Sequence, residues 1–303
     1  MPIMGKLRQA GSFLSDPRWW PFYFQRRFMS SAARGRITRW AARFRPGPLA
    51  DADTVGLQDL HERGIFHLGR ILTEAQATEI REYFRGKSVK DTYRPEQGYF
   101  LPESDQRHPH SHTAHHDARD IVMAPHLFPV VNSPAVLSVV SRYLGCRPTL
   151  GSMSAWWSYP TGIGAQHAEY FHRDVDDWKF VKLFIYLSDV GLENGPHVYV
   201  SCSTSSERLR RIARFEDAEV VTAFGDKNVL TLTGRAGEGF LEDTFGLHKG
   251  QPLQHGMRLM FSATYCMFAL PYSPVAPVAS YGEVAQQHRI EVDPWTNRLY
   301  VRG

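Results

Sequence analysis

Two histidines and one aspartate have the residue types and spacing of an open metal site. His172 and Asp174 are separated by one residue, so in an extended segment both side chains point to one side while Arg173 faces away. His248 follows 74 residues after Asp174, behind a run that reads as a strand. Two histidines and a carboxylate on one face of a metal leave the opposite positions open, which favours iron(II) oxygen chemistry over a closed structural zinc site.

Arg258 is the candidate partner of an anionic cosubstrate. It begins the run 258–264, ten residues after His248, and we expect this strand to lie beside the one that carries His248. A guanidinium inside a barrel is costly unless it binds an anion, and a dicarboxylate meets that need with two hydrogen bonds. Each residue alone has a simpler interpretation, such as a surface loop for His248 or a surface salt bridge for Arg258. Their order, spacing and strand context together predict one site.

The elements that position these residues follow a β-rich pattern. After residue 147, short runs of β-branched and aromatic residues alternate with Gly, Pro, Asn and Asp, as in an antiparallel barrel or jelly roll. The predicted strands are 150–158, 179–188, 196–201, 228–233, 238–245 and 258–269. Helices are predicted at 73–85, where Thr73 and Gln76 form a capping box, and at 134–144, which ends before Gly145.

Residues 166–200 resemble the core of the phytanoyl-CoA dioxygenase superfamily. The shared pattern runs from H-x-D at 172–174 through L-S-D-V at 187–190 to N-G-P at 194–196 and an apolar strand. With the helix at 134–144, the resemblance covers residues 55–270. It implies a mainly β fold with N-terminal helices and a double-stranded β-helix core of the jelly-roll, cupin-like type.

The resemblance also implies a ligand set and a reaction. His172, Asp174 and His248 would hold Fe(II), Arg258 would hold 2-oxoglutarate with Gln166 near it, and O2 would be the oxidant for hydroxylation of an unactivated carbon. Because Asp174 occupies its ligand position, no vacancy remains for a halide, which favours hydroxylation over halogenation. The chain departs from the family at 201–204, where Ser-Cys-Ser-Thr replaces Pro-Gly-Ser-His, so we expect a remodelled turn there.

Residues 1–48 form a basic, aromatic N-terminal extension to an oxygenase domain at 49–303. Residues 1–46 carry ten basic side chains and one acid, a net charge of +9, whereas the whole chain carries +4 and the remainder therefore −5. Met29, Ala33, Ile37, Trp40 and Phe44 recur at helical spacing, and Arg36, Arg39 and Arg43 share another face, so an amphipathic helix is predicted. Three interpretations stay open: an anionic membrane surface bound through 18–45, a helix docked on its own domain with a solvated basic face, and a transit peptide.

Composition narrows the class of protein. In 303 residues, 43% are hydrophobic and 13% aromatic, which is ample for a packed core. The three cysteines are far apart and form no C-x-x-C pair, so neither disulfides nor a zinc ribbon is expected. No run approaches 18 apolar residues and no signal-peptide pattern opens the chain. A cytoplasmic protein is expected, peripheral on the inner membrane if the basic segment binds lipid.

The substrate is the least constrained feature. The chain is similar in size and N-terminus to bacterial Kdo hydroxylases, which points to the sugar part of a membrane glycolipid, Kdo of lipid A. The alternatives are an acyl-CoA or small-molecule metabolite, and a metal-binding barrel without catalysis. Nucleic-acid binding through 18–45 is a rival that we do not expect. The loop 108–116 carries five histidines, and we interpret it as a solvated active-site lid or a phosphate contact rather than a second metal site.

Overall fold

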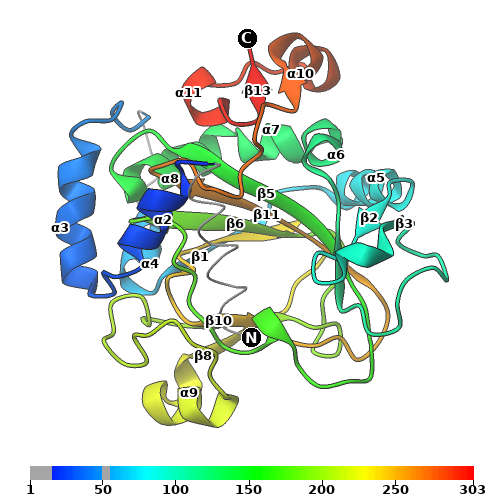
Figure 1. Cartoon of the computed structure of the whole chain (residues 1–303), viewed down its shortest axis with the longest axis horizontal. Coiled ribbons are helices and arrows are strands. Elements are labelled where there is room, and N and C mark those ends of the chain that lie inside the picture. The colour runs from blue at the N-terminus through cyan, green and yellow to red at the C-terminus, as the bar shows by residue number, and fades with distance from the viewer. Residues whose placement is uncertain (1–15, 50–54) are drawn as a thin grey trace.

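Two antiparallel sheets face each other and form a jelly roll (Figure 1). The computed structural model describes residues 16–49 and 55–303, so Lys6 and Arg8 of the basic segment lie outside the described residues. Within those ranges the long sheet has eight strands, in the order β1 (Ile65–Arg70), β9 (Glu238–Glu242), β6 (Phe180–Tyr186), β11 (Arg258–Cys266), β5 (Thr149–Ser158), β4 (Thr113–His115), β2 (Val89–Lys90) and β3 (Tyr99–Phe100). The short sheet that the described residues form is β10 (His248–Gly250), β7 (His197–Val200) and β8 (Val229–Leu232). The double-stranded β-helix class expected from the sequence is confirmed.

Helices cover the outer face of the long sheet and complete the main core. These are α4 (Val55–Glu62), α5 (Glu74–Arg85), α6 (Ala118–Met123), α7 (Leu127–Val131) and α8 (Pro134–Leu144). In α5, Ile80 and Phe84 share the buried face, as a helical repeat requires, and they join Leu183 and Phe261 of the sheet in one cluster. The smaller elements are η1 (Pro95–Gln97), η2 (His167–Glu169), α9 (Asp217–Phe224), η3 (Asp226–Asn228), β12 (Ala279–Ser280), α10 (Tyr281–His288), α11 (Pro294–Asn297) and β13 (Val301–Arg302).

Both helices predicted for the body of the chain form at the expected positions. The Thr73 hydroxyl accepts from the Gln76 amide at 3.2 Å, and the Gln76 side chain accepts from the Thr73 amide at 2.9 Å, so the capping box is present. The helix α8 ends at Gly145, whose φ of 77° is a left-handed conformation that glycine adopts without a Cβ clash. The six predicted strands also form, although β9 ends at Glu242, three residues before the predicted end.

The prediction that the strand of Arg258 lies beside the strand of His248 is wrong. The strand of Arg258, β11, pairs with β5 and β6 in the long sheet, whereas His248 begins β10 in the short sheet. Arg258 and His248 therefore reach the same cavity from opposite sheets. A jelly roll places strands that are close in sequence in different layers, so proximity along the chain does not imply pairing.

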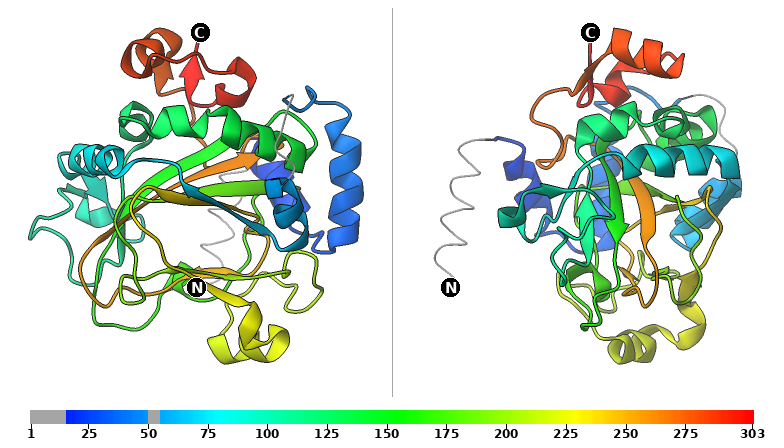
Figure 2. Two further views of the ribbon diagram at one scale, coloured as in Figure 1. Left: turned by 180° about the vertical axis from the view of Figure 1, so that it is seen from behind. Right: turned by 90° about the vertical axis from the view of Figure 1, so that its right-hand side faces the viewer.

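The described part of the basic segment, from residue 16 on, contains the helices α2 (Trp19–Gln25) and α3 (Ser31–Ala42), which lie along one side of the barrel (Figure 2). The Arg34 guanidinium of α3 is buried and donates to Gln25 Oε1 at 2.8 Å and to the carbonyl of Asp177. The helix thus docks on its own domain, but through an arginine and not through the aromatic stripe. Trp40 and Phe44 remain 62% and 73% exposed. No helix in the described part of the chain is long and apolar enough to cross a bilayer.

Candidate active site

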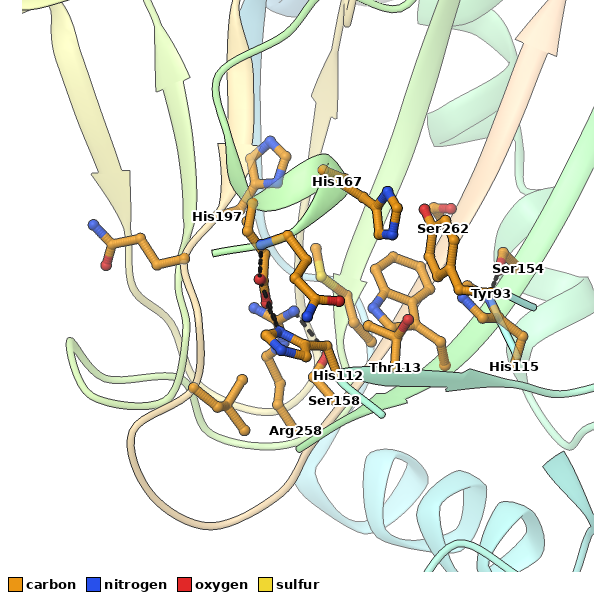
Figure 3. Close-up of a pocket in the computed structure, with 18 of the residues that line it drawn as sticks. Tyr93, His112, Thr113, His115, Ser154, Ser158, His167, His197, Arg258 and Ser262 are labelled. Atoms are coloured by element: carbon orange, nitrogen blue, oxygen red, sulfur yellow. Dashed lines mark hydrogen bonds and ion pairs between the residues drawn. The ribbon is translucent and has the colours of Figure 1, made fainter. Parts of the chain in front are cut away.

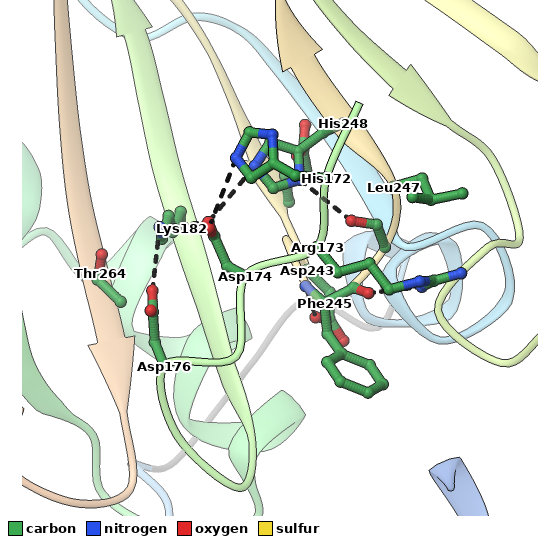
Figure 4. Close-up of polar contacts among 12 residues, drawn as sticks. His172, Arg173, Asp174, Asp176, Lys182, Asp243, Phe245, Leu247, His248 and Thr264 are labelled. Atoms are coloured by element: carbon green, nitrogen blue, oxygen red, sulfur yellow. Dashed lines mark hydrogen bonds and ion pairs between the residues drawn. The ribbon is translucent and has the colours of Figure 1, made fainter. Parts of the chain in front are cut away.

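The structure brings the three predicted metal ligands together. His172 and His248 are paired across two strands, with each amide donating to the other's carbonyl at 3.0 Å, and their ring centroids are 4.3 Å apart. Asp174 lies beneath both rings, with carboxylate oxygens 3.7 Å from His172 Nε2 and 3.4 Å from His248 Nε2 (Figure 4). One ligand atom from each residue lies within 4.8 Å of the other two. The three side chains are therefore close enough together to hold one metal ion.

Hydrogen bonds to backbone carbonyls set the tautomer of both histidines. His172 Nδ1 lies 2.9 Å from the carbonyl of Tyr170, and His248 Nδ1 lies 3.1 Å from the carbonyl of Gly246. A carbonyl only accepts, so each Nδ1 carries a proton and each Nε2 faces the common point. Burial lowers the pKa of His172 to about 3, which keeps this imidazole neutral. The charge of Asp174 outweighs burial at His248 and raises its pKa, so a metal bound there would displace a proton from His248 Nε2.

Lys182 orients the aspartate ligand. Its ammonium lies 2.6 Å from Asp174 Oδ2 and 3.1 Å from Asp176 Oδ2. Burial alone raises the pKa of Asp174, but the charges of Lys182 and His248 outweigh burial and hold it well below its ordinary value. Because β6 lies between β9 and β11, Lys182 is an interior residue and not the edge lysine that its sequence equally allows. The carboxylate is therefore ionised and held in place.

Arg258 meets the requirement for an anion site. The residue is 5% exposed, and its Nη2 donates to Ser158 Oγ at 2.9 Å, directly across the β11–β5 ladder. Its Nε and Nη1 have no hydrogen-bond partner among the described residues. Burial lowers the pKa of this guanidinium, and the charges of Tyr186 and Glu169 offset that effect only in part. A carboxylate has the shape and the charge to accept hydrogen bonds from both of these nitrogens.

One cavity of about 300 Å³ is lined by the three candidate metal ligands and by Arg258. Figure 3 shows Arg258 among the residues that line it. Gln166 lines this cavity, as do His112 and His115 from the histidine loop. His112 is held by Glu169 at 2.8 Å, and His115 by Ser154 at 3.0 Å. His112 and His115 are therefore part of the cavity wall, whereas His108, His110 and His116 do not line the cavity. Within the described residues, the loop contributes to no group of three metal-ligating side chains.

The sequence reasoning missed a buried histidine–glutamate pair beside the metal ligands. His197 Nε2 lies 2.9 Å from Glu242, and its ring stacks on that of His248 at 5.6 Å. Burial raises the pKa of Glu242 to about 8 and lowers that of His197 well below its ordinary value. Both directions favour a neutral pair in which the carboxylic acid donates to the imidazole. The available signal was a histidine at position 197, in a run otherwise apolar.

Comparison with solved structures identifies the fold. HygX from Streptomyces hygroscopicus, with nickel and 2-oxoglutarate bound, superposes with a TM-score of 0.51 and 16% identity, over 73% of this chain and 90% of that chain. EctD from S. alaskensis with bound Fe superposes with a TM-score of 0.50 and 15% identity, over 73% of this chain and 79% of that chain. No protein-family model matches the sequence, and no curated protein does either. The chain therefore has the jelly-roll fold of HygX and EctD, whose structures hold nickel with 2-oxoglutarate and iron, respectively.

Proposed function

We propose that the chain is an Fe(II)- and 2-oxoglutarate-dependent dioxygenase that hydroxylates an unactivated carbon. The observation that carries this proposal is the His172, Asp174 and His248 triad in one cavity with a buried Arg258 whose Nε and Nη1 have no hydrogen-bond partner among the described residues. The shared fold with HygX and EctD supports it. Residues 49–303 would form the catalytic domain, with 1–48 as its extension.

The roles of the residues follow from their positions. The two Nε2 atoms and Asp174 would hold the iron, and Lys182 keeps the aspartate ionised and fixed. Arg258, with Ser158 Oγ beside it, would hold the distal carboxylate of 2-oxoglutarate. When bound, iron(II) and 2-oxoglutarate supply the activation of dioxygen. Because only three side chains would hold the metal, the site would keep coordination positions for cosubstrate and oxygen.

We propose that the substrate is the sugar part of a membrane glycolipid, such as Kdo of lipid A, and that the enzyme acts as a peripheral protein at the cytoplasmic side of the inner membrane. The cavity lining includes the polar side chains Ser154, His115 and Ser262 beside the Trp156 ring, which stacks on His115, and it includes the stacked rings of Tyr93 and His167, 3.9 Å apart. Hydroxyl and imidazole groups beside flat rings suit a hydroxylated ring better than an acyl chain. This lining favours a sugar over an acyl-CoA ester.

Succinate formation tests the proposal. The iron-loaded protein should convert 2-oxoglutarate to succinate with a lipid A precursor and not with acyl-CoA esters. Asp174→Ala should abolish turnover and iron binding, whereas Arg258→Met should retain iron and lose 2-oxoglutarate binding. Anaerobic titration of the iron form with 2-oxoglutarate, followed by absorption spectroscopy, separates an enzyme from a non-catalytic metal-binding barrel. An unchanged spectrum together with no turnover on the whole panel would contradict the proposal.

A further inference from the structure

The segment 175–179 joins the aspartate of the metal triad to β6. It follows Asp174 directly, ends where β6 begins at Phe180, and forms neither helix nor strand. Figure 4 shows Asp174 and Asp176 on this connection. Without a sheet ladder, such a segment keeps its place through the hydrogen bonds that its backbone makes with other parts of the chain. These bonds therefore bear on where the Asp174 carboxylate lies.

The body of the protein supplies part of this support. The Asp174 amide donates to the carbonyl of Thr244 at 2.9 Å. The Asp177 carboxylate accepts from the amides of Met267 and Phe268 at 2.6 and 2.8 Å, just beyond the end of β11. The body thus holds the amide of Asp174 and the side chain of Asp177 in place.

The N-terminal extension binds the carbonyls of two buried residues in the segment. At the end of α2, Gln25 Nε2 donates to the Val175 carbonyl at 2.6 Å, and Arg26 Nη1 donates to the same oxygen at 3.2 Å. From α3, the Arg34 guanidinium donates to the Asp177 carbonyl. No other described residue donates to either oxygen. Val175 directly follows the aspartate ligand, so Gln25 acts one residue away from it.

Gln25 and Arg34 form one buried polar unit. Gln25 Oε1 accepts from Arg34 Nη1 at 2.8 Å, and both side chains are buried. The Arg34 guanidinium also lies over the ring of Phe245, 4.6 Å from its centre, three residues before His248. The extension therefore contacts the chain beside the aspartate ligand and the chain beside the second histidine.

The chemistry of this unit favours positioning over simple docking. Apolar side chains are sufficient to dock a helix, and burial of a guanidinium costs free energy that apolar contacts do not. Hydrogen bonds, in contrast, fix the distance and direction between two groups. A buried amide and a buried guanidinium that both bind backbone carbonyls hold the segment in one place relative to α2 and α3.

We propose that Gln25 and Arg34 are positioning residues of the metal site, which set the place of Asp174 through the backbone of residues 175–177. The inference rests on the proposed function in one respect, namely that the two histidines and the aspartate hold the metal. It makes α2 and α3 part of the catalytic unit, although both helices precede residue 49.

Nickel(II) binding by the full-length chain tests the proposal, because it requires no turnover. Gln25→Met with Arg26→Met removes both donors to the Val175 carbonyl, and Arg34→Met removes the donor to the Asp177 carbonyl. Each change should raise the Kd for nickel(II) about tenfold in competition with a chelator. Arg34→Lys keeps one donor and should recover part of the affinity. Cobalt(II) absorption, which reports the coordination geometry, should change in the same variants.

Tyr265→Phe is the matched control. The Tyr265 hydroxyl is a buried donor to the carbonyl of buried Val131 at 2.7 Å, in the core under the helices and outside the active-site cavity. Its loss should lower the free energy of unfolding and leave the Kd for nickel(II) unchanged. Urea unfolding of the metal-free proteins shows the conditions under which each variant is folded, and the metal titrations are made there. The Gln25 variant and Arg34→Lys carry the test if Arg34→Met does not fold.

The outcomes separate this proposal from the proposed function. Equal Kd values in the parent and the folded extension variants would show that α2 and α3 only support the fold, and would overturn the proposal. An equal rise in Kd for Tyr265→Phe would show a general loosening of the protein and overturn it as well. A parent that binds no nickel(II) would overturn the metal site itself, and with it both this proposal and the proposed function.

Discussion

Arg258 and Arg173 are both buried arginines, and the structure predicts opposite consequences for their removal. Arg173 donates to the carbonyls of Leu209, Ser203, Phe245 and Arg208, at 2.6–3.1 Å, so its charge is surrounded by acceptors. Arg258 has one partner, Ser158, and two donor nitrogens without any among the described residues. Arg258→Met should therefore leave the ligand-free protein as stable as the parent or more so, while Arg173→Met should destabilise it.

The magnitudes follow from these contacts. Arg173→Met removes the donor to the buried carbonyls of Ser203 and Phe245 and to the part-buried carbonyls of Leu209 and Arg208, and it should reduce the free energy of unfolding by about 3 kcal/mol. Arg258→Met removes a buried charge that Glu169 compensates only in part and should raise the free energy of unfolding by about 1–3 kcal/mol. In the presence of metal, the same change removes two charge-assisted hydrogen bonds to 2-oxoglutarate, each of about 1.5–3 kcal/mol. The Kd for 2-oxoglutarate should then rise by about 10²- to 10⁴-fold.

Urea unfolding of the metal-free proteins and calorimetric titration of the nickel-loaded proteins with 2-oxoglutarate measure both effects. Arg258→Lys serves as the matched variant, because it keeps the charge, loses the planar pair of donors and should recover only part of the affinity. Comparable destabilisation by Arg258→Met and Arg173→Met, or an unchanged Kd for 2-oxoglutarate in Arg258→Met, would refute the assignment of Arg258 as the cosubstrate arginine.

Three further predictions concern the surroundings of the site and the fold. Lys182→Met frees the Asp174 carboxylate and should weaken iron affinity about 10- to 100-fold; unchanged affinity in a competition titration would show that the lysine does not orient the ligand. Burial holds the pKa of Glu242 near 8, above its ordinary 4.5, so the folded chain keeps a proton that the unfolded chain releases between these values. The free energy of unfolding should fall as pH rises through that window, by up to about 1.4 kcal/mol per pH unit. Glu242→Gln keeps a donor to His197, so it should remove this pH dependence when urea unfolding is measured at several pH values. A parent protein without this pH dependence would contradict the neutral pair of His197 and Glu242. Thr73→Ala removes the cap of α5 and should cost about 1 kcal/mol in urea unfolding, and no loss would mean that the cap is replaced by water.

The N-terminal helices show where periodicity stops being informative. The spacing of Ile37, Trp40 and Phe44 correctly predicts that 31–42 is helical, yet it does not say which face is buried. The buried face is set by acceptors on the body, namely the carbonyls of Val175 and Asp177, which bind Gln25 and Arg34. The face with Arg34, Thr38 and Ala41 docks because those acceptors are there, whereas Arg36, Arg39 and Arg43 and the rings of Trp40 and Phe44 are left outside.

Residue types and local spacing by themselves determined α5, α8, the main strands and the shared direction of His172 and Asp174, because each depends on neighbours within a few positions. They also selected His248 and Arg258 as candidates, by chemistry. Only the tertiary structure decided that His248 pairs with His172 and that Arg258 faces them from the other sheet. It alone revealed that Lys182 binds Asp174. Contacts between segments some 75 residues apart depend on sheet register and layer order, which arise from the packing of the whole barrel and not from any short stretch of chain.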